Sequence, residues 1–461
     1  TGVGLQTVGK TTVVNATFAQ NRKDIEVKDG APAPVVRNSV SWNNEVQNLS
    51  DAEGTANVNF PAGTENNDIQ NGPNFINPMA EDVLERDYGI RPSLNLLNRG
   101  DNEIYNELVL DEPSAQNIPA TERDLANNSR QTGTKVDVGA YEYSADLQQV
   151  IYVKPVVGGN GTGESWANAT SDLQGAIDLV AVYAANNPGS KGYVFVHNTQ
   201  PINNRLRVSM PGTMIYGSMN DEVSDQTDVE GLVSDLVNKR QGILQNNRRT
   251  QISQGLDITA SSVVDGFEIA GGVQLGNDGC LSTSIVKGPV QGVTGGTTGL
   301  LYNTLVTDDE AGTAGNVNGV QAVNVTAAGT IADRMGNANN RASVTETNAY
   351  VTENYWNRQL METSEDIDGG KTDIASYRDM VGHDRDLIGN LRVRHKVDNG
   401  CFETWNISKE MTSGNVITAE DYPLGKSVVY VRKGQELKIE NASDGTLLYP
   451  AGNSFTPGFL L

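Results

Sequence analysis

Short apolar stretches recur along the chain at nearly constant intervals, each bounded by Gly, Asn, Asp or Thr. Residues 13–18 read Val-Val-Asn-Ala-Thr-Phe, and residues 35–40, which begin 22 residues later, read Val-Val-Arg-Asn-Ser-Val. In the second half, apolar pairs recur every 16 to 20 residues, at Phe267/Ile269, Ile285/Val286, Leu305/Val306 and Val323/Val325. Short strands at this spacing, with no helix between them, do not fit a βαβ fold. They predict an all-β coil in which each turn pairs in parallel with the next.

A second repeat has a much longer period. The string Val-Asp-Val-Gly-Ala-Tyr-Glu at 136–142 matches Val-Asp-Asn-Gly-Cys-Phe-Glu at 397–403, and Arg-Asp-Leu precedes both, at 123–125 and 385–387. This ordered match predicts two copies of one closing segment. We therefore predict three parts. Residues 1–145 hold the last rungs and closing segment of a first module, 146–405 hold a second module, and 406–461 form a β segment that either completes the second coil or begins another module.

One stretch has helical spacing. Leu173, Ile177 and Ala184 recur at helical intervals, and Asn-Asn-Pro-Gly at 186–189 ends the pattern. We predict a helix near 171–185 that caps the first turn of the second module, where an apolar interior and an unpaired strand edge would otherwise be exposed. A helix that binds a partner is the alternative.

Composition and charge narrow the function classes. The chain has 461 residues, 49 of them Gly, and a formal net charge of −23, which disfavours nucleic acid and anionic lipid as partners. We expect no membrane span, because no apolar run approaches the roughly 20 residues that cross a bilayer. The two cysteines, Cys280 and Cys401, are expected to be buried free thiols and predict neither a disulfide framework nor a metal site.

Several strings together resemble a known family. Three of them are Ile-Tyr-Val-Lys-Pro at 151–155, Ser-Trp-Ala-Asn-Ala-Thr at 165–170 and Ile-Tyr-Gly at 215–217. The others are the string at 264–272 and an ending in two parts, at 72–78 and 137–142. With these strings the chain resembles right-handed parallel β-helix proteins of the pectate-lyase-like superfamily, in particular large surface proteins of Bacteroidetes-type bacteria described as adhesins. The resemblance implies a right-handed solenoid with rungs of ~17–22 residues and a secreted protein at the cell surface, attached to the outer membrane.

Two stretches depart from that pattern. Residues 218–251 are polar and poorly patterned, so they predict a long insertion or irregular rungs. The chain ends on an apolar strand-like segment and begins within a rung pattern, which leads us to expect a piece of a larger protein.

Two acidic segments are candidate metal sites, and calcium is the cofactor that they would favour because it takes six to eight oxygen ligands from a flexible loop. One is Asp308, Asp309 and Glu310, for which a solvated loop is the alternative. The other contains Asp366, Asp368 and Asp373, for which a plain turn is the alternative. The spacing within this second segment does not fit an EF-hand, which needs a Glu at its twelfth position. We otherwise expect no cofactor.

A basic segment is the candidate ligand site. Arg392, Arg394 and His395 could bind an anionic glycan in an otherwise acidic chain, or could pair with carboxylates of the closing segment that follows.

The repeated carboxylates of the closing segments, Asp137, Glu142, Asp398 and Glu403, have a fixed spacing that also suits catalysis. Because both pairs fall where a coil ends, and exposed backbone donors there need acceptors, we predict that they are structural cap residues. We predict no catalytic residue.

The fold does not decide function, because coils of this kind host enzymes and binding proteins alike. We expect a non-enzymatic, adhesin-like protein that binds a glycan or a surface protein through its elongated face. The alternatives are a polysaccharide lyase or glycoside hydrolase on the same scaffold, and a structural stalk.

Overall fold

The computed structural model describes most of the chain as far as residue 403. The described residues are 2–47, 49, 55–69, 71–103, 123–130, 135–143, 147–157, 159–199, 201–224, 226–242, 249–332, 340–343, 370, 374–387, 392 and 397–403. Two compact units can be separated. The first comprises Thr1–Phe195, Arg207–Ile215 and Ala260–Ser262, and the second comprises Val196–Leu206, Tyr216–Thr259 and Val263–Leu461. The three-part division expected from the repeats stays a prediction, and its last part, 406–461, lies outside the described residues.

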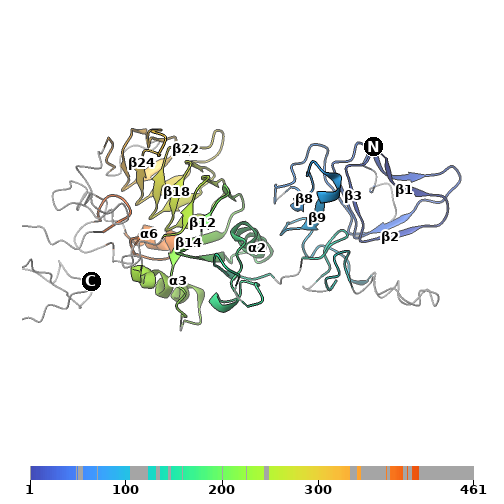
Figure 1. Ribbon diagram of the computed structural model, residues 1–461, viewed down its shortest axis with the longest axis horizontal. Coiled ribbons are helices and arrows are strands. Elements are labelled where there is room, and N and C mark those ends of the chain that lie inside the picture. Colours follow the sequence, from blue (N-terminus) through green and yellow to red (C-terminus); the bar gives the residue numbers. More distant parts are fainter. Residues whose placement is uncertain are drawn as a thin grey trace, which may run out of the picture. The chain divides into compact units, whose positions relative to one another are not determined.

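The first unit begins with two turns of short parallel strands (Figure 1). The parallel pairs are β1 (Val3–Thr7) with β4 (Lys23–Val27), β2 (Thr12–Val14) with β5 (Val35–Arg37), and β3 (Thr17–Ala19) with β6 (Val40–Trp42), which also pairs with β7 (Val58–Asn59). An antiparallel pair, β8 (Phe75–Asn77) and β9 (Asp87–Ile90), follows. The repeated stretches 13–18 and 35–40 thus each span two strands joined at a corner rather than one strand.

Three larger parallel sheets make up the described part of the coil that follows. The first is β10 (Val150–Val153), β11 (Gly192–His197), β14 (Thr213–Met219), β17 (Val263–Asp265), β20 (Cys280–Ser282), β23 (Leu300–Tyr302) and β26 (Gln321–Val323). The second is β12 (Pro201–Ile202), β15 (Gln251–Ile252), β18 (Glu268–Ala270), β21 (Ile285–Lys287), β24 (Leu305–Thr307) and β27 (Thr326–Ala327). The third is β13 (Leu206–Val208), β16 (Leu256–Ile258), β19 (Val273–Leu275), β22 (Val290–Gly292), β25 (Val317–Asn318) and β28 (Ile331–Ala332).

The register confirms the predicted parallel stacking. Val263, Cys280, Leu300 and Gln321 are successive partners in the first sheet, so that its rungs take 17 to 21 residues. A mostly β chain with three large parallel sheets is compatible with a β-helix solenoid. The right-handed sense expected from the resemblance stays a prediction.

A single residue in the left-handed conformation turns the chain between the first and second sheets. Successive rungs place Gly266 (φ 85°), Thr283 (φ 47°), Asn303 (φ 45°) and Asn324 (φ 53°) at this corner. Asparagine and glycine occupy this region at least cost, which explains why the apolar stretches are bounded by them. The inner row of the first sheet, Val264, Leu281, Leu301 and Ala322, is at most 1% exposed and forms part of the core.

Helices lie beside the strands (Figure 1). The described helices are α2 (Leu173–Asn186), α3 (Val229–Asn238), α6 (Ile374–Val381) and the 3-10 turns η2 (Val83–Glu85), η4 (Trp166–Asn168) and η5 (Lys239–Gly242). Helix α2 begins after Asp172, whose side chain accepts from Gly175 N, close to the predicted start at 171. That this helix caps the coil stays a prediction. The poorly patterned stretch 218–251 contains α3 and η5.

Candidate functional site

The outer face of the third sheet carries a row of polar side chains. Asp257, Gln274, Gln291 and Asn318 are successive partners in β16, β19, β22 and β25, and the last three are exposed. The neighbours of Gln274 in its strand, Val273 and Leu275, are buried, because alternate residues of a strand point to opposite faces. We call Asp257, Gln274, Gln291 and Asn318 the polar row.

The polar row begins at an ion pair. Arg205 donates from Nε to Asp257 Oδ2 at 2.9 Å and from Nη2 to Asp257 Oδ1 at 2.5 Å, which is the bidentate geometry that suits a guanidinium and a carboxylate. The two side chains are 33% and 18% exposed. Among the residues that the structure describes, the amides of Gln274, Gln291 and Asn318 form no ion pair of this kind, and all three side chains are exposed, so that they can donate to and accept from a ligand.

The outer face of the first sheet is covered instead. Asp265, Ser282 and Tyr302 are successive partners on that face, and all three are buried. Helix α6 and the residues after it contribute Tyr377 and His383 to this cover: the rings of Tyr377 and Tyr302 are 5.0 Å apart, and His383 Nε2 lies 3.0 Å from Asp265 Oδ1.

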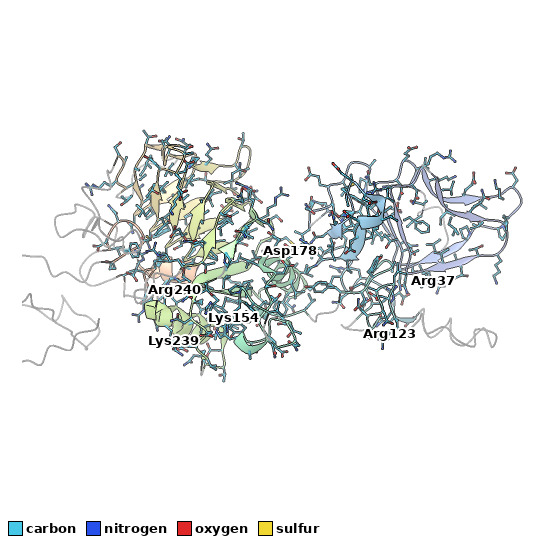
Figure 2. The ribbon with its side chains drawn as sticks, viewed as in Figure 1. Arg37, Arg123, Lys154, Asp178, Lys239 and Arg240 are labelled. Carbon is cyan, nitrogen blue, oxygen red and sulfur yellow. The ribbon has the colours of Figure 1, made fainter. Side chains whose placement is uncertain are left out.

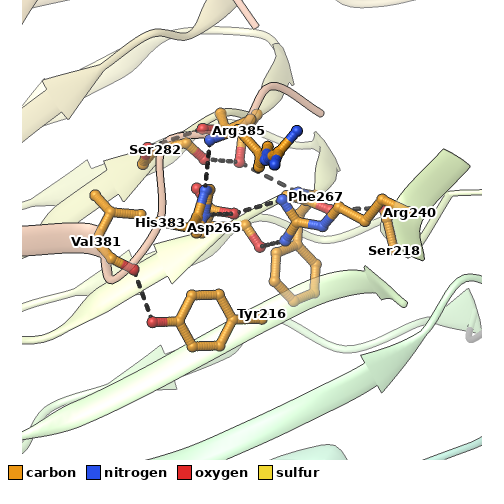
Figure 3. Close-up of polar contacts among 12 residues, drawn as sticks. Tyr216, Ser218, Arg240, Asp265, Phe267, Ser282, Val381, His383 and Arg385 are labelled. Atoms are coloured by element: carbon orange, nitrogen blue, oxygen red, sulfur yellow. Dashed lines mark hydrogen bonds and ion pairs between the residues drawn. The ribbon is translucent and has the colours of Figure 1, made fainter. Parts of the chain in front are cut away.

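The centre of the covered face is a buried ion network (Figure 3). Asp265 Oδ1 also lies 2.7 Å from Nη1 of Arg240, and neither of these two side chains is exposed. Burial alone would raise the pKa of Asp265, but His383 and Arg240 outweigh it and hold that pKa well below its usual range. His383 Nδ1 accepts from Arg385 N at 3.1 Å, which makes Nε2 the protonated nitrogen and the donor to Asp265.

Arg240 reaches this network from the turn after α3 (Figure 2). Its neighbour Lys239 pairs at 3.1 Å with the partly exposed Asp235. The two adjacent bases therefore have different surroundings, one partly solvated and one fully buried. Gly266 provides the space for Arg240, because a Cβ at that position would lie 2.3 Å from Arg240 Nη2.

Two tyrosines add hydrogen bonds around the network. Tyr216 donates to Val381 O at 2.8 Å, and Tyr377 Oη lies 2.6 Å from Thr283 Oγ1. The network thus joins the coil to the segment after α6. With Arg240, Asp265 and His383 at most 3% exposed, the network is closed to a substrate, and its chemistry is that of a structural anchor.

The two closing segments form the same set of bonds. In the first, Arg130 Nη1 donates to Gly139 O at 3.0 Å, Glu142 N to Asp124 Oδ2 at 2.8 Å, and Asp137 N to Glu142 Oε2 at 3.0 Å. In the second, the corresponding bonds are Arg392 Nη1 to Gly400 O at 3.1 Å, Glu403 N to Asp386 Oδ2 at 2.9 Å, and Asp398 N to Glu403 Oε1 at 3.1 Å. Asp137, Glu142, Asp398 and Glu403 are all buried, and their role as cap residues stays a prediction.

The predicted ligand and metal residues are placed as follows. Arg392 is 1% exposed and lies 3.7 Å from Glu403, so its guanidinium contacts the closing segment. Its role in ligand binding stays a prediction. Arg394 and His395 lie outside the described residues.

The acidic segment at 308–310 uses its carboxylates locally. Asp309 Oδ1 accepts from Thr313 N at 2.6 Å and Asp308 Oδ1 accepts from Gly315 N at 2.8 Å. These bonds come from within the loop, and the first lowers the pKa of Asp309. Within the described ranges no three His, Cys, Asp or Glu residues are grouped closely enough to hold a metal ion. Asp366, Asp368 and Asp373 lie outside those ranges, and calcium binding stays a prediction for both segments.

Sequence reasoning missed the residues that the structure brings together. Gln274 and Gln291 occupy the same strand position one rung apart, and 17-residue spacing of like amides is the signal that could have found them. Arg240 and His383 had no such signal, because they come from outside the repeating rungs.

Comparisons with known proteins do not assign the chain to a family. No protein-family model, no curated protein and no solved structure matches the chain. Among the described helices, none combines the length and the apolar character needed to cross a bilayer.

Proposed function

We propose that this chain is a non-enzymatic, adhesin-like protein that binds a glycan along the outer face of its third sheet. The observation that supports the proposal is the polar row, in which Gln274, Gln291 and Asn318 present exposed amides on adjacent strands. The same face could instead bind a surface protein, and the experiment below distinguishes a protein partner from a glycan. The site of action is outside the cell, at a cell surface.

The chemistry of the row favours a neutral glycan. Strands in one sheet are about 4.8 Å apart, which is close to the length of one sugar unit, so successive amides meet successive hydroxyl-bearing rings. An amide both donates and accepts hydrogen bonds, as a hydroxyl does. A polyanionic glycan is disfavoured because the chain carries a net charge of −23.

An enzyme is the alternative, either a polysaccharide lyase or a glycoside hydrolase. It is favoured by Arg205 and Asp257, which place a base and a carboxylate at one end of the polar row. A hydrolase needs a second carboxylate roughly 5 to 9.5 Å away. A stalk is the third candidate, favoured by the duplicated closing segment.

The test is a panel of immobilised neutral glycans, uronate-rich glycans and surface proteins, probed with the full chain with and without calcium. We expect retention on neutral glycans and no release of reducing ends or unsaturated product. Release of product from any glycan would show that the chain is an enzyme. Retention on proteins alone would show that the partner is a protein and not a glycan. No retention on any surface would favour the structural stalk.

A further inference from the structure

A segment that follows the coil lies on the outer face of the first sheet. We call this segment, which is α6 and the residues after it (374–387), the strap. Tyr377 attaches it through Thr283, and Val381 and His383 attach it through the contacts described above (Figure 3). The coil side chains in contact with the strap are buried, namely Tyr216, Asp265, Thr283 and Tyr302. The strap thus shields these side chains from solvent.

Both ring nitrogens of His383 have partners. Nε2 donates to Asp265 Oδ1 at 3.0 Å, and Nδ1 accepts from Arg385 N at 3.1 Å. A neutral imidazole suits these two bonds because it carries one donor and one acceptor. In the protonated ring both nitrogens are donors, so that Nδ1–H would face the N–H of Arg385. Protonation therefore breaks the bond that fixes the ring within the strap.

The charged groups around His383 disfavour a second cation there. Asp265 attracts a proton to the ring, but the same carboxylate oxygen already pairs with Arg240 at 2.7 Å. Burial is the main cause that lowers the pKa of His383, and the guanidinium groups of Arg240 and Arg392 add to it. The docked strap therefore keeps the ring neutral at a pH where a solvated histidine, with a pKa of about 6.5, takes up a proton.

The other titratable groups near the ring do not change charge in that range. The ring centroids of Tyr216 and Tyr377 lie 6.0 and 6.1 Å from that of His383, and a tyrosine is neutral below about pH 10. In the strap itself, Asp384 pairs with Arg385 at 3.5 Å, and both side chains are partly exposed. Of these groups, His383 is thus the one whose charge changes between about pH 7 and 5.

We propose that the strap is an acid-released cover of the first sheet, in which protonation of His383 detaches residues 374–387 and exposes the polar face beneath them. The contribution of the neutral ring to docking is complete above about pH 6.5 and is lost as pH falls. All the groups involved belong to the second unit, except Arg385's solvent neighbours, and the polar row lies on a different sheet. Release of the strap therefore does not depend on glycan binding.

Hydrogen exchange of the full chain, measured by mass spectrometry of strap peptides, tests the proposal. Rates are corrected for the intrinsic pH dependence of amide exchange. We expect the amides of residues 377–387 to lose protection by roughly tenfold between about pH 7 and 5, while β20 and β23 of the same sheet keep theirs. An equal loss in these strands would show global unfolding, and unchanged protection of 377–387 would show that the strap stays docked. Either result would overturn the proposal, and neither comparison needs a variant.

Variants assign the effect to one ring. His383→Gln is the matched variant, because its amide provides a donor and an acceptor and takes up no proton in this range. Its strap should keep the same protection at both pH values. His197→Gln is the control, since His197 ends β11 and lies outside the strap, and it should follow the wild type. Circular dichroism and Tm at about pH 7 verify that both fold. An acid-dependent loss in folded His383→Gln as large as in the wild type would contradict the assignment.

Discussion

Arg240 Nη1 and Asp265 Oδ1 lie 2.7 Å apart with both side chains fully buried. The pair depends on Gly266, which follows Asp265 and leaves room for the guanidinium. Other rungs place Thr283, Asn303 or Asn324 at this corner, so a positive φ alone does not require glycine here. Glycine is required at 266 because Arg240 approaches the backbone closely.

Gly266→Ala is therefore expected to destabilise the chain for two reasons. The left-handed conformation costs an alanine about 1 kcal/mol, and the new Cβ would displace Arg240. Gly295 has a similar φ of 86° but no atom within 4 Å of a built Cβ, so Gly295→Ala isolates the conformational cost. Urea unfolding should show a loss of about 3 kcal/mol for Gly266→Ala and about 1 kcal/mol for the control. Equal losses would show that the close approach is unimportant.

Asp265→Asn should cost about 3 to 5 kcal/mol, because it leaves the Arg240 charge buried without a counter-charge. Asp257→Asn is the matched control, since it breaks a bidentate pair with Arg205 that is partly exposed, and pairs of that kind contribute about 0 to 1 kcal/mol. Denaturant unfolding measures both free energies. A small loss for both variants would argue against the anchoring role of the network.

Glu142 is expected to make stability fall as pH rises. Burial, and then the neighbouring Asp137, raise the pKa of Glu142 to about 9, above the value of about 4.3 in an unfolded chain. The folded state thus keeps a proton that the unfolded state releases, so the contribution is complete below about pH 4.3 and is lost as pH rises through about 9. Glu142→Gln cannot ionise and keeps an acceptor for Asp137 N.

Tm measured between about pH 5 and 9 should fall less steeply for Glu142→Gln than for the wild type, by thermal melts in matched buffers. Glu85→Gln, at an exposed position, should follow the wild-type curve. Parallel curves for all three proteins would mean that Glu142 ionises alike in both states.

The repeating part of the fold was accessible from the sequence. Period and bounding residues predicted the parallel rungs because each rung needs an apolar inner row and a corner residue that tolerates positive φ, as Asn303 and Asn324 do. The duplicated strings at 136–142 and 397–403 likewise predicted a common closing segment, and both copies form the same bonds.

The sites were harder to predict from the sequence, for a physical reason. The partners of Asp265 are Arg240, 25 residues before it, and His383, 118 residues after it, and neither belongs to a rung. These side chains come together only because α3 and the segment after α6 pack on the coil. The repeat in the sequence carries no information about that packing. The polar row follows the period, but exposure of Gln274 and Gln291 depends on which sheet face other segments cover.

Binding of the glycan by the polar row is tested most directly by one titration. The glycan that retains the chain in the panel is titrated into the wild type and into a Gln274→Ala/Gln291→Ala/Asn318→Ala variant. The control is a variant in which the exposed amides Asn203, Asn204 and Gln226 are changed to alanine. Each lost hydrogen bond is expected to cost about 0.5 to 1.5 kcal/mol. We therefore predict a loss of affinity of at least roughly tenfold for the polar-row variant, unchanged affinity for the control, and wild-type Tm for both. Wild-type affinity in a folded polar-row variant would contradict the claim.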